Sequence, residues 1–230
     1  MKAVSICACV FFCLIFMPFK VMAYKPDQIP LADEIEFKIF RNGNPFGIHR
    51  IRFSEENERL VTDVIIRMSV GIGPFSFFKY EHENREVWKD DTLISMDAYT
   101  DDDGKEYNVT AKKTEEGYAV TVNGESFNVD GPLAGTTYWN IDTFGNYALL
   151  NTQKGYIEDF ELVGSGVDTI EVAGKEYEAD HYIVKLPERE IHAWYEKETK
   201  QWVGLRFSIR GSNISYYRET PIERVQTPNG

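Results

Sequence analysis

Apolar and polar residues alternate along most of this chain with a period of two, which is the pattern of β-strands that bury one face. Ile35, Phe37 and Ile39 alternate with charged residues, and the same alternation runs through residues 60–70 and 203–209. A helical period of about 3.6 residues persists nowhere in the sequence. The fold class predicted from this pattern is mainly all-β.

Short turn sequences separate the alternating segments. Asn42-Gly43, Asp103-Gly104, Asn123-Gly124 and Ala173-Gly174 stand where two strands would be joined by a tight hairpin. Strands joined in this way are antiparallel neighbours, so we expect an antiparallel meander of about twelve strands. A sheet of that length curls, and the meander is therefore predicted to form one strongly curved, barrel-like sheet, open or closed.

One long segment interrupts the meander. Residues 131–145 are rich in turn-forming and aromatic residues, and residues 146–151 are predicted to form a short helical segment. A long loop inside a compact domain usually carries function or covers something. We therefore expect the segment 131–151 to act as a plug or lid of the curved sheet.

The alternation also slips once within a predicted strand. Tyr177 and Ala179 share one parity, whereas Tyr182 and Val184 share the other. An extra residue near Asp180 would produce this slip, so a β-bulge is predicted there.

Residues 1–23 have the features of a secretory signal peptide. Lys2 supplies the positive start, Ala3–Phe19 is a nearly continuous apolar run, and Val21-Met22-Ala23 provides a cleavage site after Ala23. A membrane anchor needs about 18 clean apolar residues, and Pro18 interrupts this run. We expect a cleaved signal, a periplasmic or secreted product, and no integral membrane insertion after cleavage.

The cysteines bear on how the exported domain is held together. All three, Cys7, Cys9 and Cys13, lie within the predicted signal peptide. The mature chain therefore has no disulfide and depends on burial for its stability. We divide it into an extended segment (24–32), a single β domain (33–219) and a flexible tail (220–230).

The charge balance excludes some partners. The chain has 25 Lys and Arg against 37 Asp and Glu, a formal net charge of −12. No basic cluster is longer than a pair of residues. Nucleic acid and anionic membrane surfaces repel such a chain, so neither is predicted as a partner.

Familiar catalytic and metal-binding patterns are missing from the sequence. It contains no G-x-S-x-G, no H-E-x-x-H and no phosphate-binding glycine loop. His82 and Glu86 lie four positions apart on a predicted strand, about 13 Å from one another, too far to bind one metal alone. Residues 101–104 lack the ligand spacing of a calcium loop and are interpreted as a turn. We predict no cofactor, no metal and no catalytic residue.

One strand face combines aromatic and polar side chains. Between Phe75 and Trp88, alternation places Lys79, Glu81, Glu83, Arg85 and Val87 toward solvent. His82, Asn84 and Glu86 then project inward together with aromatic residues. Buried polar groups are costly unless they are hydrogen-bonded. They therefore either bond one another as a structural network, which is the favoured interpretation, or face a ligand.

Aromatic residues elsewhere extend this face. Tyr138 and Trp139 belong to the interrupting segment, and Trp194 to a late strand. Aromatic side chains with a few polar groups are typical of ligand pockets, although core packing is the commoner use. The candidate ligand-binding residues are therefore Tyr80, His82, Asn84, Glu86, Trp88, Tyr138, Trp139 and Trp194.

Several motifs carry a family resemblance. They are Gly47–Arg50, Tyr80–Asn84, Asp97–Gly104, Tyr138–Asn140, Leu149–Gln153 and Trp194-Tyr195. With these motifs the chain resembles an uncharacterised family of exported bacterial proteins, the domain of unknown function family 6134. It is more loosely similar to periplasmic lipoprotein-carrier-like half-barrel proteins. The second resemblance implies an open barrel around an acyl or other apolar ligand, but a shared fold does not fix function.

Three functions follow from these patterns, in decreasing order of support. The first is a non-catalytic binding or carrier protein of the cell envelope, with an apolar small molecule or lipid as its ligand. The second is a structural or interaction module with a filled core and an envelope protein as partner. The third is a hydrolase, resting only on His82 and Glu86 sharing a face. An empty cavity inside the sheet would favour the first, and a packed core the second.

Overall fold

The structure is a computed structural model that describes residues 32–72 and 75–222. The expected signal peptide, nearly all of the segment 24–32 and the end of the tail 220–230 lie outside the described residues. Within the described residues, no helix has the length and apolar character needed to cross a membrane.

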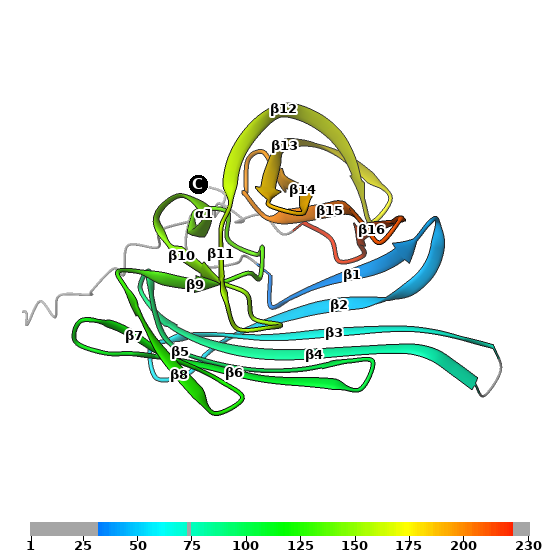
Figure 1. Ribbon diagram of the computed structural model, residues 1–230. Helices are drawn as coiled ribbons and strands as arrows, with labels where there is room; N and C mark the ends of the chain where they lie inside the picture. The colour runs from blue at the N-terminus through cyan, green and yellow to red at the C-terminus, as the bar shows by residue number, and fades with distance from the viewer. Residues whose placement is uncertain (1–31, 73–74, 223–230) are drawn as a thin grey trace, which may run out of the picture.

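Most of the described chain belongs to one antiparallel sheet of thirteen strands, drawn in Figure 1. Their order is β12-β13-β14-β15-β16-β1-β2-β3-β4-β5-β6-β7-β8, and each joins its neighbours antiparallel. The strands are β1 (Glu34–Arg41), β2 (Asn44–Glu55), β3 (Leu60–Ile72), β4 (Phe75–Lys89), β5 (Thr92–Asp102), β6 (Lys105–Lys113), β7 (Gly117–Val122), β8 (Glu125–Asp130), β12 (Glu161–Val172), β13 (Lys175–Leu186), β14 (Arg189–Glu196), β15 (Trp202–Ile209) and β16 (Ser212–Arg218).

This arrangement confirms the predicted fold class. The sheet is strongly curved and barrel-like but not closed, because β8 and β12 are its two unpaired edges. The last strand, β16, pairs with the first, β1, with Phe37 opposite Arg218. The first and last strands of the described residues are therefore neighbours in the middle of the sheet rather than at its edges.

Local sequence explains the hairpins. Asn42-Gly43, Asp103-Gly104, Asn123-Gly124 and Ala173-Gly174 all have positive φ at both residues, between 49° and 93°. Two consecutive left-handed residues form the type I′ turn, whose twist matches that of the strands it joins. These four predicted turns are confirmed.

The segment that interrupts the meander lies inside the curve of the large sheet (Figure 1). It contains β9 (Leu133–Gly135), α1 (Thr143–Asn146) and β10 (Ala148–Leu150), and β11 (Ile157–Glu158) follows it. The strands form a small sheet in the order β11-β10-β9, with β9 and β10 parallel. We call residues 131–158 the plug.

The expected helix over residues 146–151 is wrong. The helical turn α1 ends at Asn146, and Ala148–Leu150 is a strand paired on both sides. Leu149 and Leu150 are both at most 1% exposed. A short apolar run buried on both faces is compatible with either a helix or a strand, and here the hydrogen bonds to β9 and β11 decide.

The parity slip in β13 also has a different cause from the predicted bulge. The pairing of β13 with β14 is continuous, and the bulge lies on the neighbouring β12, between Gly164 and Gly166. Ala179 packs in a small cluster with Trp194, whereas Val184 packs in the main core. The two halves of β13 thus bury opposite faces, which reverses the parity without an inserted residue.

Candidate functional site

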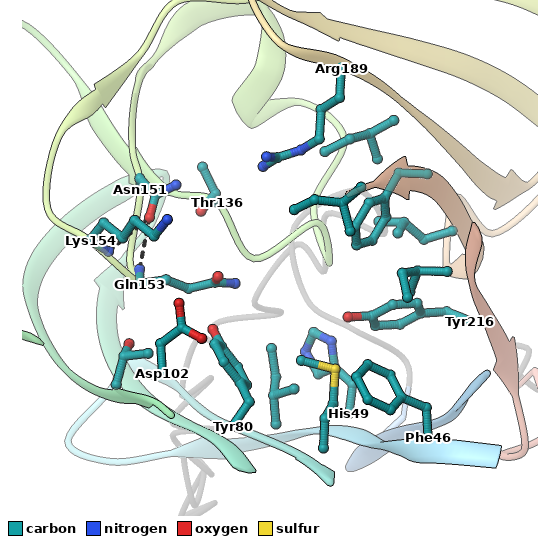
Figure 2. Close-up of a pocket in the computed structure, with 18 of the residues that line it drawn as sticks. Phe46, His49, Tyr80, Asp102, Thr136, Asn151, Gln153, Lys154, Arg189 and Tyr216 are labelled. Carbon is teal, nitrogen blue, oxygen red and sulfur yellow. Dashed lines mark hydrogen bonds between the residues drawn. The ribbon is translucent and has the colours of Figure 1, made fainter. Parts of the chain in front are cut away.

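A partly open cavity of about 350 Å³ lies between the two arms of the curved sheet and the plug (Figure 2). This volume falls within the range of small-ligand sites, about 300–1,000 Å³. The apolar part of the wall consists of Phe46, Ile66, Met68, Phe78, Ile191, Leu205, Phe207 and Ile214. The polar part includes His49, Tyr80, Asp102, Gln153, Lys154, Arg189 and Tyr216.

The other half of the concave face is filled, and Glu86 lies at its centre. Asn84 donates its Nδ2–H to Glu86 Oε1 at 3.1 Å, and Trp88 donates its indole N–H to Glu86 Oε2 at 3.0 Å. Thr62 Oγ1 adds a longer contact of 3.4 Å to Oε2. Glu86 is completely buried, so its carboxyl group is held by groups of the protein itself. We call these four residues the Glu86 network.

The plug covers this network closely. A Cβ atom at Gly135 would lie 2.2 Å from Glu86 Oε1 and 2.7 Å from Thr152 Cγ2. Only glycine permits β9 to approach so near. Burial under this strand raises the pKa of Glu86, and the hydrogen bonds from Asn84 and Trp88 oppose that shift.

His82 is buried beside the network but bonds elsewhere. Its Nδ1 lies 2.9 Å from Thr100 Oγ1 and its Nε2 lies 3.3 Å from Thr152 Oγ1. Burial lowers the pKa of His82 to about 4, against a smaller opposing effect of a hydrogen bond to the Tyr99 backbone. As a neutral ring between two hydroxyls, His82 joins β4 to β5 and to the plug.

His49, in contrast, has no hydrogen-bond partner among the described residues for either ring nitrogen. It is 4% exposed and lies among aromatic rings, with centroid distances of 5.3 Å to Trp202 and 5.7 Å to Tyr216. Burial, and then the charge of His82, lower the pKa of His49 to about 3. A neutral imidazole in the cavity wall therefore holds one unmet donor and one unmet acceptor, both buried.

Tyr80 is the second residue of the cavity wall with a buried polar group that lacks a hydrogen-bond partner among the described residues. It is 6% exposed, lines the cavity, and its hydroxyl has no partner among the described residues. Burial raises the pKa of Tyr80 well above its ordinary value, so the hydroxyl keeps its proton. Figure 2 shows Tyr80 and Tyr216 directing their hydroxyl groups into the same space, with His49 below.

The structure separates the eight candidate residues into three places. Tyr80 and Tyr138 line the cavity. His82, Asn84, Glu86, Trp88 and Trp139 are buried behind or beside it and are not part of its wall.

Trp194 occupies the third place, in the small cluster on the opposite face of β14. Its indole donates to Asp168 Oδ2 at 2.8 Å and stacks on His181 with centroids 4.7 Å apart. There the sheet register also brings His181 Nε2 within 2.9 Å of His192 Nδ1, a pairing that sequence spacing did not suggest. No group of three potential metal ligands exists among the described residues.

Sequence reasoning missed His49, Arg189, Gln153 and Tyr216. Only His49 carried a usable signal. It shares parity with Ile51 and Phe53 on β2, so it is a single polar residue within an inward apolar row. The others come from separate strands and from a loop, whose convergence no local pattern reveals.

Comparisons with known proteins agree with this fold. A family model described as "Domain of unknown function (DUF6134)" matches residues 37–219. A solved structure, the beta-barrel-like protein of domain of unknown function DUF1849 from Brucella abortus, is similar with a TM-score of 0.62 at 9% identity. The alignment covers 86% of this chain and 100% of the other. Identity this low shows a shared fold alone. A comparison with curated proteins gives no match.

Proposed function

The chain belongs to the DUF6134 family, and we propose that it is a non-catalytic binding or carrier protein for an apolar, lipid-like ligand. The ligand would occupy the cavity between the sheet and the plug. The observation that carries this proposal is that two polar groups in a mainly apolar wall, the His49 ring and the Tyr80 hydroxyl, have no partner among the described residues. Each unmet buried group costs about 1–3 kcal/mol, which a ligand with matching polar atoms would offset.

Export is part of the proposal. Its support is the pattern of residues 1–23, with cleavage after Ala23, and the absence of cysteine from the rest of the sequence. Intact mass measurement of the protein recovered from the envelope fraction of its own cells tests this point. A mass equal to that of a chain beginning at Tyr24 agrees with export. A full-length product found in the cytosol contradicts it.

The binding function is tested by native mass spectrometry of the protein purified from its own cell envelope. We expect a mass above that of the polypeptide, with the excess released into an organic extract. Met68→Trp supplies the control, because Met68 lines the cavity and the larger indole of Trp would fill part of it. That variant should fold and carry less ligand. A polypeptide-only mass, together with no thermal stabilisation by added lipids, would rule the proposal out.

The filled half of the concave face favours a second function, a structural or interaction module of the envelope. The Glu86 network and the plug would then serve only to stiffen the sheet. Cross-linking in intact cells should capture one defined envelope protein, and the Met68→Trp variant should capture it equally well. Recovery of no reproducible partner would remove this alternative.

A further inference from the structure

The geometry points to a ligand with an anionic head group on a single aliphatic chain, with Arg189 and Lys154 holding the head. This inference rests on the proposed function, because it specifies the ligand of the same cavity. The shared head chemistry is a carboxylate or phosphate oxyanion, and the two sources are distinguished by the experiment below.

The charge of the cavity wall is the first support. The chain as a whole is strongly acidic, yet Arg41, Lys154, Arg189 and Arg210 line the cavity against the single carboxylate of Asp102. None of these four cations forms an ion pair with a described residue. The wall is therefore complementary to an anion.

The solvent-facing side of the sheet shows the contrast. There Arg50 pairs with Glu36, Arg67 with Glu83, and Arg85 with Asp63. Arg52 is paired with Glu34 in the same way. The cations of the cavity wall are left without such partners.

Arg189 is the central cation. It is the first residue of β14, and its guanidinium lies over the Phe207 ring at 5.9 Å. Its buried Nε–H has no partner among the described residues. Figure 2 shows the guanidinium directed into the cavity from the side opposite Tyr80 and His49. A guanidinium with unmet donors is suited to bind two oxygens of a carboxylate or phosphate at once.

Lys154 is presented by an ordered turn of the plug. Asn151 Oδ1 accepts the backbone N–H of Gln153 at 3.1 Å and that of Lys154 at 2.9 Å, as the dashed lines in Figure 2 indicate. The next residue, Gly155, has φ of +79° and lies so close to Val122 that a Cβ atom would be 2.3 Å from its Cγ2. The turn is thereby fixed, with Gln153 and Lys154 at the cavity wall.

The apolar wall accommodates the chain of such a ligand. Phe46, Met68, Phe78 and Leu205 form part of it on the sheet side. The cavity volume of about 350 Å³ is near the lower limit for ligand sites, which favours one aliphatic chain over two.

Displacement of a neutral apolar fluorophore tests the inference with three probes of equal chain length: palmitate, hexadecyl phosphate and hexadecanol. A charge-assisted hydrogen bond is stronger than one between neutral groups. At least one of the two anions should therefore bind about tenfold or more tightly than the alcohol. The preferred anion identifies the head as carboxylate or phosphate.

Two variants and one control locate the effect. Arg189→Gln and Lys154→Gln should each reduce the preference for the anion several-fold and leave hexadecanol unchanged. Lys154 is exposed, so its variant keeps the fold even if Arg189→Gln does not. Arg52→Gln removes the same charge from an exposed side chain outside the cavity and should change nothing.

The outcomes separate the two proposals. Equal binding of all three probes, unaffected by either variant, overturns the anionic head but leaves the apolar binding function standing. Binding of none of the probes, and no displacement of the fluorophore by extracted envelope lipids, overturns the binding function and this inference with it.

Discussion

The two halves of the concave face use similar residues to opposite effect. In the filled half, Glu86 accepts hydrogen bonds from Asn84 and Trp88, and of the buried side-chain atoms described there only Asn84 Oδ1 lacks a partner. In the hollow half, both nitrogens of His49 and the hydroxyl of Tyr80 have none among the described residues. An inward polar residue therefore does not by itself indicate a binding site. The distinction lies in whether the protein satisfies its hydrogen bonds.

The position of the plug determines which half of the concave face is filled and which is hollow. Gly135 contacts the Glu86 network, and the next residue, Thr136, already lines the cavity. Tyr80 and Glu86 lie on the same strand and the same face, with His82 and Asn84 between them. The boundary between core and cavity therefore crosses β4 within a few residues.

The largest loss of stability should come from removing the hydrogen bonds of the Glu86 network in the filled half. Glu86→Ala leaves the Asn84 and Trp88 donors unpaired and creates a void under β9. We expect the free energy of unfolding to fall by about 3–5 kcal/mol, measured by urea denaturation. A loss below about 1 kcal/mol would show that the network is not a structural element.

Acidification should destabilise both halves. His49 and His82 have pKa values of about 3 and about 4, below the ordinary 6.5. Between each lowered pKa and 6.5, the unfolded chain therefore binds more protons than the folded protein. Their stabilisation is complete above pH 6.5 and is lost as the pH falls, by about 1.4 kcal/mol per pH unit for each histidine. Glu86, whose pKa is raised, acts in the opposite direction and favours the folded state as it becomes protonated.

Two variants isolate the histidine contributions. Urea denaturation from about pH 7.5 to about pH 5 should give a shallower pH dependence for His49→Asn and for His82→Asn than for the unchanged protein. At neutral pH, His82→Asn should also cost stability, because it breaks two contacts to threonine hydroxyls. If His49→Asn lost as much stability at neutral pH, the contrast between satisfied and unsatisfied groups would fail.

A smaller effect is expected where the plug contacts the network. Gly135→Ala forces a Cβ atom against Glu86 Oε1, and overpacking of this kind costs about 1–3 kcal/mol. Gly145→Ala is the matched control, because its Cβ would meet no atom within 4 Å and its φ is not positive. Thermal unfolding should separate the two variants. Equal melting temperatures would mean that β9 can move away without cost.

The smallest change in stability should come from the hollow half. Tyr80→Phe removes a hydroxyl that has no partner among the described residues. The free energy of unfolding should therefore change by no more than about 0.5 kcal/mol, or should increase. Affinity for the anionic probe should fall about tenfold, measured by titration calorimetry. A clear loss of stability without loss of affinity would reverse the assignment of this half.

The sequence allowed the inward face of β4 to be predicted because side chains alternate across any strand. Tyr80, His82, Asn84, Glu86 and Trp88 are all buried, as their parity requires. The same pattern predicted a network of His82, Asn84 and Glu86, but in the structure Glu86 bonds Asn84 and Trp88, and His82 lies outside the network. The partners of His82 could not be predicted, because Thr100 and Thr152 come from another strand and from the plug.

What the sequence by itself determined are the strands, their buried faces and the tight hairpins. These follow from short-range physics, namely side-chain alternation and the left-handed backbone of residues such as Asn42 and Gly43. The tertiary structure alone decided the pairing of β1 with β16, the burial of Trp194 on the opposite face, and the position of the plug. Each depends on contacts between residues far apart in the chain. For the same reason, only the folded molecule shows that Glu86 accepts hydrogen bonds, while the ring nitrogens of His49 and the Nε–H of Arg189 have no partner among the described residues.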